Sequence, residues 1–256
     1  MKRKVVFTSY GTKEYAATLK RIGREAKSTG WFSSVRILGP ADLPTPYKSH
    51  LDQFLHAAKG GGYWLWKPIL IRENMRNLSQ DDILVYADAG CHVNRQGDFS
   101  RYVELLNASP FGSLSFQMPF PEQFWTSPRV FEYFGIPENS EHRQSGQFVG
   151  GIQLFRKCRE SDELIERVCK VVDEAPELFT DLPLTGREPA GYGGCRHDQS
   201  IWSVAKKMHG TSAITDETWG DDWGKLQHVP IQARRIRQVV PLHRRAFRWL
   251  RRSLFR

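Results

Sequence analysis

The residue of this chain whose position most clearly suggests chemistry is Asp88, an acid at the end of the apolar stretch ILVYA. Continuous apolar residues predict a buried strand, and the small residues Ala89 and Gly90 follow the acid. A carboxylate in this setting suits a metal ion or a phosphate that the backbone approaches closely, since Mg²⁺ and Mn²⁺ prefer one or two carboxylates and take further oxygens from water and phosphate. The alternative is that Asp88 only begins a turn or caps a neighbouring element.

A second stretch whose residue types could bind a ligand is GYWLWKP, just upstream. The apolar spacing predicts a helix over residues 66–78, with the proline tolerated in its first turn. Trp66 and Lys67 begin this helix, and Trp64 lies just before it. Either these aromatic side chains wall a pocket that Asp88 completes, or they are core packing and Lys67 extends its ammonium outward to solvent.

Alternating strands and helices must position these residues. The strands are expected over residues 4–11, 34–40, 81–90, 111–118 and 146–157, and the helices over residues 14–30, 47–62 (as far as its glycines), 66–78, 99–109, 161–175 and 196–208. The last helix has Asp198 as its expected N-cap, after a loop at residues 181–195. This alternation predicts a Rossmann-like α/β fold, a mainly parallel sheet with helices on both faces.

Several chemically suited residues fall at the ends of the expected strands. They are Ser9, Tyr10 and Gly11; Asp88, Ala89 and Gly90; and Gly150 and Gly151. In open α/β sheets the ligand binds outside the carboxyl ends of the strands. These strand ends are therefore expected to border one shared cleft.

The charge of the chain is unevenly distributed. Of its 256 residues, the segment 234–256 holds nine arginines and no acid, so with a net charge of +9 the rest is formally neutral. We expect one domain over residues 1–233 and a basic tail over 234–256. A nucleic-acid-binding protein usually carries its basic residues across a folded face, so no nucleic-acid partner is expected. The four cysteines lack metal-site spacing and are expected to be reduced, and the N-terminus lacks the pattern of a signal peptide.

Three stretches in a fitting order resemble a known family. DDILVYADAGC, QFVGGIQLFRK and RHDQSIWSV, within about residues 3–208, are similar to the GT-A-fold glycosyltransferases, particularly the glycogenin-like group and the bacterial lipooligosaccharide galactosyltransferases. Asp88 matches the first acid of the family's DxD motif, and Gly90 stands where the second acid would be. A set of bacterial sugar transferases combining YWxWKP, YxDAG and HxDQS is more similar still, and in that set the glycine belongs to the pattern.

The other two stretches match the family in part. Gly150 and Gly151 match its small pair, while Val149 replaces an asparagine. Asp198 and Gln199 match the first two residues of its Asp-Gln-Asp helix start, while Ser200 replaces the second acid. These departures leave two readings open: an active transferase, or a catalytically inactive GT-A-like domain that binds a nucleotide or a glycan.

The resemblance implies roles for individual residues. Catalysis is expected from Asp198 and Gln199. Donor binding is expected from Ser9, Tyr10, Gly11, Lys67, Asp88, Ala89, Gly90, Gly150, Gly151, Arg196 and His197. Acceptor contacts are expected from Glu122 and Trp125, and a divalent cation, Mn²⁺ or Mg²⁺, is expected at Asp88 with His92 and His228.

The expected activity is transfer of a sugar from a nucleotide-sugar donor to a glycan or lipid-linked acceptor, in cell-surface polysaccharide biosynthesis. Asp198 would deprotonate the acceptor hydroxyl in an inverting enzyme, or stabilise positive charge near the anomeric carbon in a retaining one. The alternative for Asp198 is a plain N-cap, although a cap needs neither Arg196 nor His197 beside it.

The tail has the pattern of an interfacial helix over residues 242–256. Phe247, Leu250 and Leu254 share one helical stripe, and arginines share another. Such a helix binds an anionic membrane surface, which would place the protein in the cytoplasm and at the inner face of the cytoplasmic membrane. The alternative is a basic tail that packs on the body or is disordered.

Overall fold

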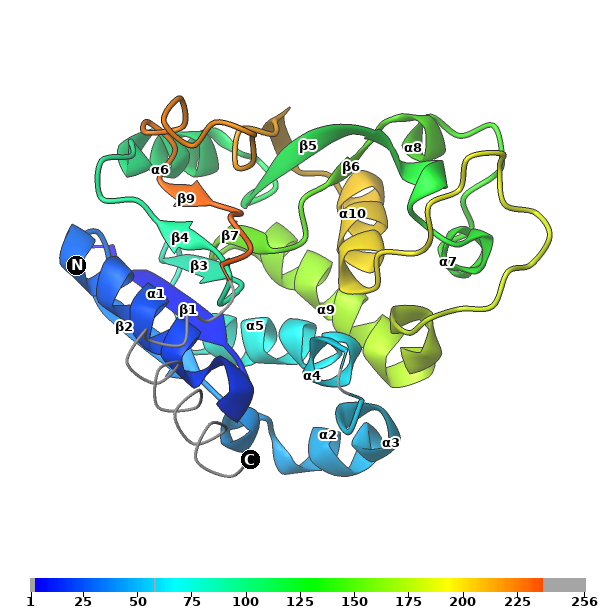
Figure 1. Ribbon diagram of the computed structural model, residues 1–256, viewed down its shortest axis with the longest axis horizontal. Coiled ribbons are helices and arrows are strands. Elements are labelled where there is room, and N and C mark those ends of the chain that lie inside the picture. The colour runs from blue at the N-terminus through cyan, green and yellow to red at the C-terminus, as the bar shows by residue number, and fades with distance from the viewer. Residues whose placement is uncertain (1–2, 58, 237–256) are drawn as a thin grey trace, which may run out of the picture.

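A computed structural model describes residues 3–57 and 59–236, and within them the chain forms an α/β fold built on a seven-stranded sheet (Figure 1). The strands are β1 (Val5–Tyr10), β2 (Ser34–Leu38), β3 (Ile83–Ala87), β5 (Ser113–Pro121), β6 (Gly146–Phe148), β7 (Ile152–Arg156) and β8 (Ser212–Thr215). Their order is β2-β1-β3-β7-β5-β6, with β8 also paired to β5.

The sheet is mixed, with most strands pointing one way. β1 is parallel to β2 and β3, and β8 is parallel to β5. β7 is antiparallel to both β3 and β5, and β6 is antiparallel to β5. Only β6 and β7 therefore oppose the common direction, and the carboxyl ends of β1 and β3 meet at one edge, where β7 begins.

Helices cover both faces of the sheet, as the sequence predicts. α1 (Ala16–Thr29) and α6 (Phe99–Ala108) pack on one face around Phe7 and Val85. α5 (Trp66–Arg76), α9 (Arg159–Glu174) and α10 (Asp198–His209) pack on the other, around Tyr86 and Phe155. The short helices are α2 (Thr45–His50), α3 (Asp52–Leu55), α4 (Gly60–Tyr63), α7 (Pro128–Tyr133) and α8 (Glu141–Gln144), with 3₁₀ turns at Lys13–Tyr15, Pro40–Asp42, Glu122–Phe124 and Pro176–Phe179.

Two expected elements differ from the prediction. The strand expected over residues 146–157 is two strands, β6 and β7, because the chain leaves β5 at Val149 and joins β3 after Gly151. The helix expected over residues 47–62 is divided into α2, α3 and α4, since the backbone leaves the right-handed helical region at Leu51 and again at the glycines of α4.

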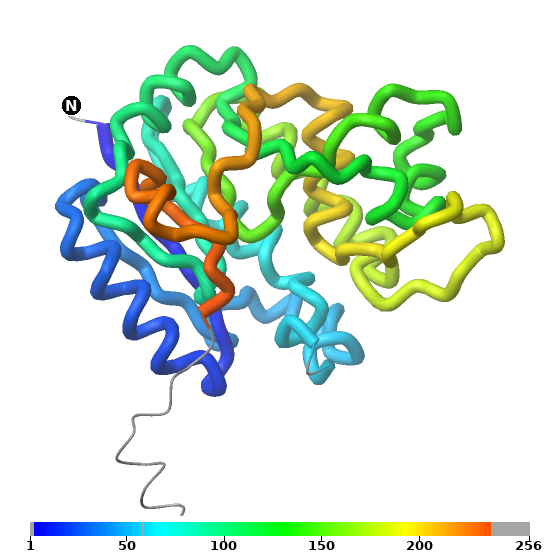
Figure 2. The backbone as a smooth tube through the Cα atoms, turned by 45° about the horizontal axis from the view of Figure 1, so that its top comes forward, coloured from blue at the N-terminus to red at the C-terminus, as the bar shows by residue number. Residues whose placement is uncertain are grey.

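The chain returns to the first half of the fold near its described end. β9 (Ile231–Gln232) pairs antiparallel with β4 (His92–Val93) in a separate two-stranded sheet. Figure 2 shows this segment in orange, crossing in front of the strands to reach the chain that follows β3. Residues 234–236 of the expected tail thus pack on the body, and the helix expected over 242–256 lies outside the described residues.

No helix within residues 3–57 and 59–236 combines the length and the apolar character that a membrane crossing requires.

Candidate active site

A buried lysine is the centre of the site. Lys67 is the second residue of α5, and its side chain is only 1% exposed. Its ammonium donates to Asp198 Oδ2 at 2.6 Å, lies 3.1 Å from Asp88 Oδ1 and donates to the carbonyl of Gly150 at 3.3 Å. A lysine has three N–H donors, and these three acceptors satisfy them. The alternative of an outward-pointing Lys67 is therefore wrong.

The turn before α5 fixes Lys67 in this position. Trp66 stacks on Tyr10 with ring centroids 3.8 Å apart, and its indole N–H donates to the carbonyl of Gly60 at 3.0 Å. Trp64 adopts left-handed backbone dihedrals and stacks on His197 at 5.4 Å. The aromatic residues of GYWLWKP are thus packing elements that hold the lysine under the two acids.

The backbone of Asp88 begins a turn, and its carboxylate is partly exposed. Its N–H donates to the carbonyl of Gly151 at 2.8 Å, and its own carbonyl accepts from Cys91 N–H at 2.8 Å. Its Oδ1 accepts from the hydroxyl of Tyr86 at 2.7 Å as well as facing Lys67. Because the side chain remains 34% exposed, the turn does not remove its carboxylate from a ligand's reach.

Asp198 is not the N-cap of α10. The cap is His197, with φ 53° and ψ −127°, and Asp198 is the first helical residue. A non-glycine residue in that backbone region is strained, and such strain gathers at functional sites. The His197 ring lies 2.9 Å from the carbonyl of Phe179 through Nδ1. The capping alternative for Asp198 is wrong, because its carboxylate is directed to Lys67 instead.

Strained backbone gathers around the same cluster. Besides Asp81, the non-glycine residues with positive φ in the described chain are Tyr63, Trp64, His197 and Arg235. The first two precede Lys67, the third precedes Asp198, and the fourth contacts Gly90. The fold thus maintains unfavourable backbone dihedrals just before Lys67, just before Asp198 and against the loop that follows Asp88.

The glycine pair before β7 allows the chain to pack closely against Gln199 and Asp88. A Cβ at Gly150 would lie 2.5 Å from Cβ of Gln199, and one at Gly151 would lie 2.9 Å from Oδ2 of Asp88. Gln199 accepts from Gly150 N–H at 3.1 Å and donates to Gln147 at 2.6 Å. A larger residue at either position would separate the residues that the site brings together.

Burial and charge set the ionisation of the cluster. Burial raises the pKa of Asp198, and Asp88 adds to this, while Lys67 opposes it; the resulting pKa is about 6. Burial by itself lowers the pKa of Lys67, but Asp198 and Asp88 outweigh it and leave that pKa above its ordinary 10.5. At neutral pH, above the pKa of Asp198 and below that of Lys67, these two side chains are charged and form an ion pair.

An aromatic surface borders the cluster. The guanidinium of Arg196 lies 4.0 Å from the ring centroid of Trp125, whose carbonyl accepts from Arg196 N–H at 3.1 Å and from Ser200 at 2.8 Å. Phe120, 49% exposed, meets Trp125 edge-on at 6.2 Å. Trp125 therefore lies next to the residues that lead into Asp198.

Glu122 has a different place from the one expected. Its side chain is 0% exposed and lies 2.9 Å from Lys207 Nζ, and it also accepts from Gln147 at 2.8 Å, from Thr126 at 2.6 Å and from Ser203. A fully enclosed carboxylate with these partners cannot contact a sugar acceptor. Glu122 instead fastens the aromatic segment to α10, which corrects the expected acceptor contact.

The expected metal ligands do not converge. His92 Nδ1 lies 3.2 Å from Glu25 of α1, and His228 is exposed, with its carbonyl accepting from Asp98 N–H at 2.9 Å. Within the described residues no three side chains of His, Cys, Asp or Glu are grouped to hold a metal ion. The inward oxygen of Asp88 is already shared by Lys67 and Tyr86. The residues present therefore do not fit the expected cation at Asp88, His92 and His228.

The end of the first strand supports the site from beneath. Ser9 is fully buried, and its hydroxyl has no hydrogen-bond partner among the described residues; Tyr10 is buried against Trp66, so neither side chain is open to a donor. Gly11 is half-buried, with its N–H donating to the carbonyl of Leu38 at 3.2 Å. The sequence did not single out Tyr86, although its place two residues before Asp88 on one strand puts both side chains on the same face.

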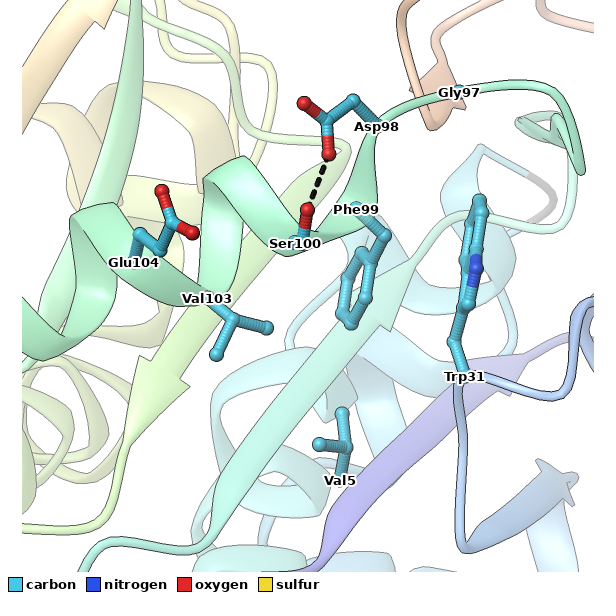
Figure 3. Close-up of a pocket in the computed structure, with 8 residues that line it drawn as sticks. All are labelled: Val5, Trp31, Gly97, Asp98, Phe99, Ser100, Val103 and Glu104. Atoms are coloured by element: carbon cyan, nitrogen blue, oxygen red, sulfur yellow. Dashed lines mark hydrogen bonds between the residues drawn. The ribbon is translucent and has the colours of Figure 1, made fainter.

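A separate hollow lies on the other face of the sheet. It encloses about 460 Å³ and is bordered by Trp31, Phe99 and Glu104, with the two aromatic rings stacked 5.0 Å apart (Figure 3). None of the residues around Lys67 lines it.

No protein-family model matches the chain, and no curated protein matches it. Solved structures similar to it include three glycosyltransferases. One is involved in the glycosylation of the major capsid of PBCV-1 (12% identity, TM-score 0.45, covering 96% of this chain and 99% of that chain), one is mouse xyloside xylosyltransferase 1 (13%, 0.49, 93% and 99%), and one is the galactosyltransferase LgtC (11%, 0.44, 93% and 81%). The likeness concerns the fold, so the function proposed below rests on this chain's own residues.

Proposed function

We propose that this chain is a glycosyltransferase that moves a sugar from a nucleotide-sugar donor to a hydroxyl of a glycan or lipid-linked acceptor. The proposal rests on one observation: the Lys67 ammonium lies between Asp88 and Asp198 at one edge of the sheet. Lys67 and Asp198 are 131 positions apart in the sequence. Stretches far apart in the sequence meet there, at the place where open α/β sheets bind ligands.

Asp198 supplies the acid–base chemistry in this proposal. With a pKa of about 6 it is ionised at neutral pH and more basic than an exposed aspartate, as a base that takes a proton from an acceptor hydroxyl must be. In a retaining enzyme the same charge, with the Gln199 amide beside it, would stabilise positive charge at the anomeric carbon. Lys67 keeps this carboxylate ionised and oriented.

Asp88 and the aromatic surface bind the sugars in this proposal. The open carboxylate of Asp88 accepts hydrogen bonds from donor sugar hydroxyls, and a side chain at Gly151 would crowd its outer oxygen. Trp125, with Phe120 next to it, offers an apolar face to the acceptor ring. The acceptor belongs to cell-surface polysaccharide assembly in this reading.

The tail carries the proposal for the location of the protein. Residues 242–256 are proposed to bind an anionic membrane surface at the inner face of the cytoplasmic membrane, and the support is their stripe of arginines beside a stripe of apolar residues. Residues 1–233 are proposed as the transferase domain.

A turnover assay tests the proposal. The full chain is incubated with each common nucleotide sugar and a glycan acceptor, and release of nucleoside diphosphate is measured for the wild type, Asp198→Asn and Asp162→Asn. Asp162 of α9 is the matched control because it pairs with Lys157, away from the site. We expect release from one donor, lost in Asp198→Asn and kept in Asp162→Asn. Nucleotide-sugar binding without turnover in the wild type would favour the inactive binding domain instead.

A further inference from the structure

The glycine at position 90 faces the described end of the chain. The carbonyl of Gly90 accepts from Ile236 N–H at 2.8 Å, and a Cβ at Gly90 would lie 3.2 Å from Cα of Arg235. The segment that follows β9 therefore lies on the loop where a second acid of a DxD motif would stand. The small residue at position 90 is explained by this close backbone approach.

Arg235 is placed beside Gly90 by a specific backbone conformation. Its φ of 53° is left-handed, which a non-glycine residue adopts only where the surrounding structure requires it. The segment is anchored before it by the β4–β9 pairing and by Ala233 N–H donating to Thr218 at 2.7 Å. The neighbouring Arg234 bonds Gln232 at 2.6 Å instead, so the two adjacent arginines have different surroundings.

A second arginine, Arg196, lies on the other side of Asp198 in the sequence. The guanidinium of Arg196 rests on Trp125, two residues before Asp198, and is exposed. Burial against Trp125 lowers the pKa of Arg196, and the nearby charge of Arg235 lowers it further. Both arginines thus lie beside the acids, Arg196 two residues before Asp198 and Arg235 against Gly90, which is two residues after Asp88.

Neither guanidinium is neutralised by an acid. Every Asp and Glu of the sequence lies in the part of the chain that the structure describes, and none of their carboxylates forms an ion pair there with Arg196 or Arg235. Two cations without an acid partner leave positive charge beside the site, and this charge attracts an anion. Arginine offers a planar pair of donors that suits phosphate oxygens.

The charge of the Lys67 cluster shows why such cations are needed. Lys67 neutralises one of its two acids and has no free N–H, so the cluster alone repels an anionic ligand. A diphosphate beside Asp88 therefore requires positive charge from outside the cluster. Arg196 and Arg235 supply it, whereas no metal ligand set is assembled around Asp88 in the described residues.

We propose that Arg196 and Arg235 bind the donor's diphosphate over Gly90, and that donor binding needs no divalent cation. This inference rests on the proposed function, since it names the part of the chain that holds the leaving group of the same reaction. It also makes the segment 233–236 a part of the donor site and no longer the start of an independent tail.

Binding measurements on the full chain test the inference. Inorganic pyrophosphate and a set of nucleoside diphosphates are titrated by calorimetry into the wild type, Arg235→Gln, Arg196→Gln and the matched control Arg234→Gln, with excess EDTA and again with Mn²⁺. We expect Arg235→Gln and Arg196→Gln to raise Kd about tenfold or more, which is about 1.4 kcal/mol, and Arg234→Gln to change it less than about twofold. EDTA should leave the wild-type Kd within about twofold.

Gly90→Ala tests the close approach without removing a charge. The added methyl group meets Arg235 Cα at 3.2 Å and displaces the segment, so the pyrophosphate Kd should rise. In combination with Arg235→Gln the two effects should not add, because both act through one contact. Circular dichroism of each variant checks that the chain remains folded.

The outcomes separate the two proposals. Binding that requires Mn²⁺, or equal affinities for Arg235→Gln and Arg234→Gln, would overturn this inference and leave the transferase intact. Absence of binding by every nucleoside diphosphate, with and without Mn²⁺, would overturn both.

Discussion

Two buried lysines of α5 and α10 allow the Lys67 cluster to be tested by one matched pair of substitutions. Lys67 lies between two carboxylates, whereas Lys206 is buried against Phe155 with no hydrogen-bond partner in the described chain. Both side chains are 1% exposed. Replacement by Met keeps most of the length and apolar volume of lysine and removes only the charge, so the two variants differ in what surrounds the lost ammonium.

The expected changes have opposite signs. Lys67→Met leaves Asp198 and Asp88 without their cation, and removing one partner of a buried ion pair costs about 3–5 kcal/mol. Lys206→Met removes a group whose burial lowers its pKa from 10.5 to about 7; at about 1.4 kcal/mol for each pKa unit, its burial costs up to about 5 kcal/mol. Lys206→Met should therefore be neutral or stabilising.

The pH dependence of each variant follows from the same groups. Without Lys67 the pKa of Asp198 rises further, because the lysine lowers it in the wild type. A raised folded-state pKa costs nothing below the unfolded value of about 3.9 and costs more as pH rises, so the Lys67→Met penalty should shrink toward acid. The gain from Lys206→Met should be largest below pH 7 and disappear as pH rises toward 10.5, since only the unfolded state keeps the Lys206 proton over that interval.

Urea unfolding followed by tryptophan fluorescence gives these free energies directly. Each variant is unfolded at about pH 5 and about pH 8. The dependence of its unfolding free energy on urea concentration is compared with that of the wild type, to confirm that unfolding exposes the same surface. A Lys67→Met variant as stable as Lys206→Met at the higher pH would refute the account of Lys67 as a counter-ion.

The remaining predictions concern the chemistry and the packing of the site. The kcat/KM of the wild type should rise with pH through about 6, because Asp198 must lose its proton to act as a base; a flat profile there would exclude this role. Gly150→Ala should abolish turnover, since its methyl group would lie 2.5 Å from Cβ of Gln199, and unchanged activity would show that this contact is not required. Glu122→Gln should destabilise the chain by about 3–5 kcal/mol in urea unfolding, because it leaves Lys207 buried without its acid, and should leave the acceptor KM of the folded protein unchanged. A raised acceptor KM at unchanged stability would return Glu122 to the acceptor site.

The fold was predictable from local patterns. The apolar run before Asp88 and the glycine that ends α1, with φ 73°, are encoded within a few residues, and the structure confirms the α/β fold they indicate. The shared edge of the sheet followed from the general rule for open α/β sheets. What remained open were the partners of the side chains at that edge.

Those partners depend on contacts between distant parts of the chain. Whether Lys67 turns inward is decided by Asp198, 131 positions away, and the enclosure of Glu122 is decided by Lys207. No pattern in the neighbouring sequence distinguishes an acid that is buried and paired with a lysine from an acid that is exposed to solvent. The approach of Arg235 to Gly90 likewise depends on the pairing of β4 with β9.

The most direct test of whether this chain uses a nucleotide sugar is a thermal-shift panel. Nucleotide sugars and nucleoside diphosphates are added in excess EDTA and again with Mn²⁺. A ligand that binds only the folded state raises Tm by mass action. We expect one nucleotide to raise Tm in EDTA, and its sugar nucleotide to be the donor consumed in the turnover assay. No rise with any nucleotide under either condition would contradict the assignment of this chain as a nucleotide-sugar-dependent transferase.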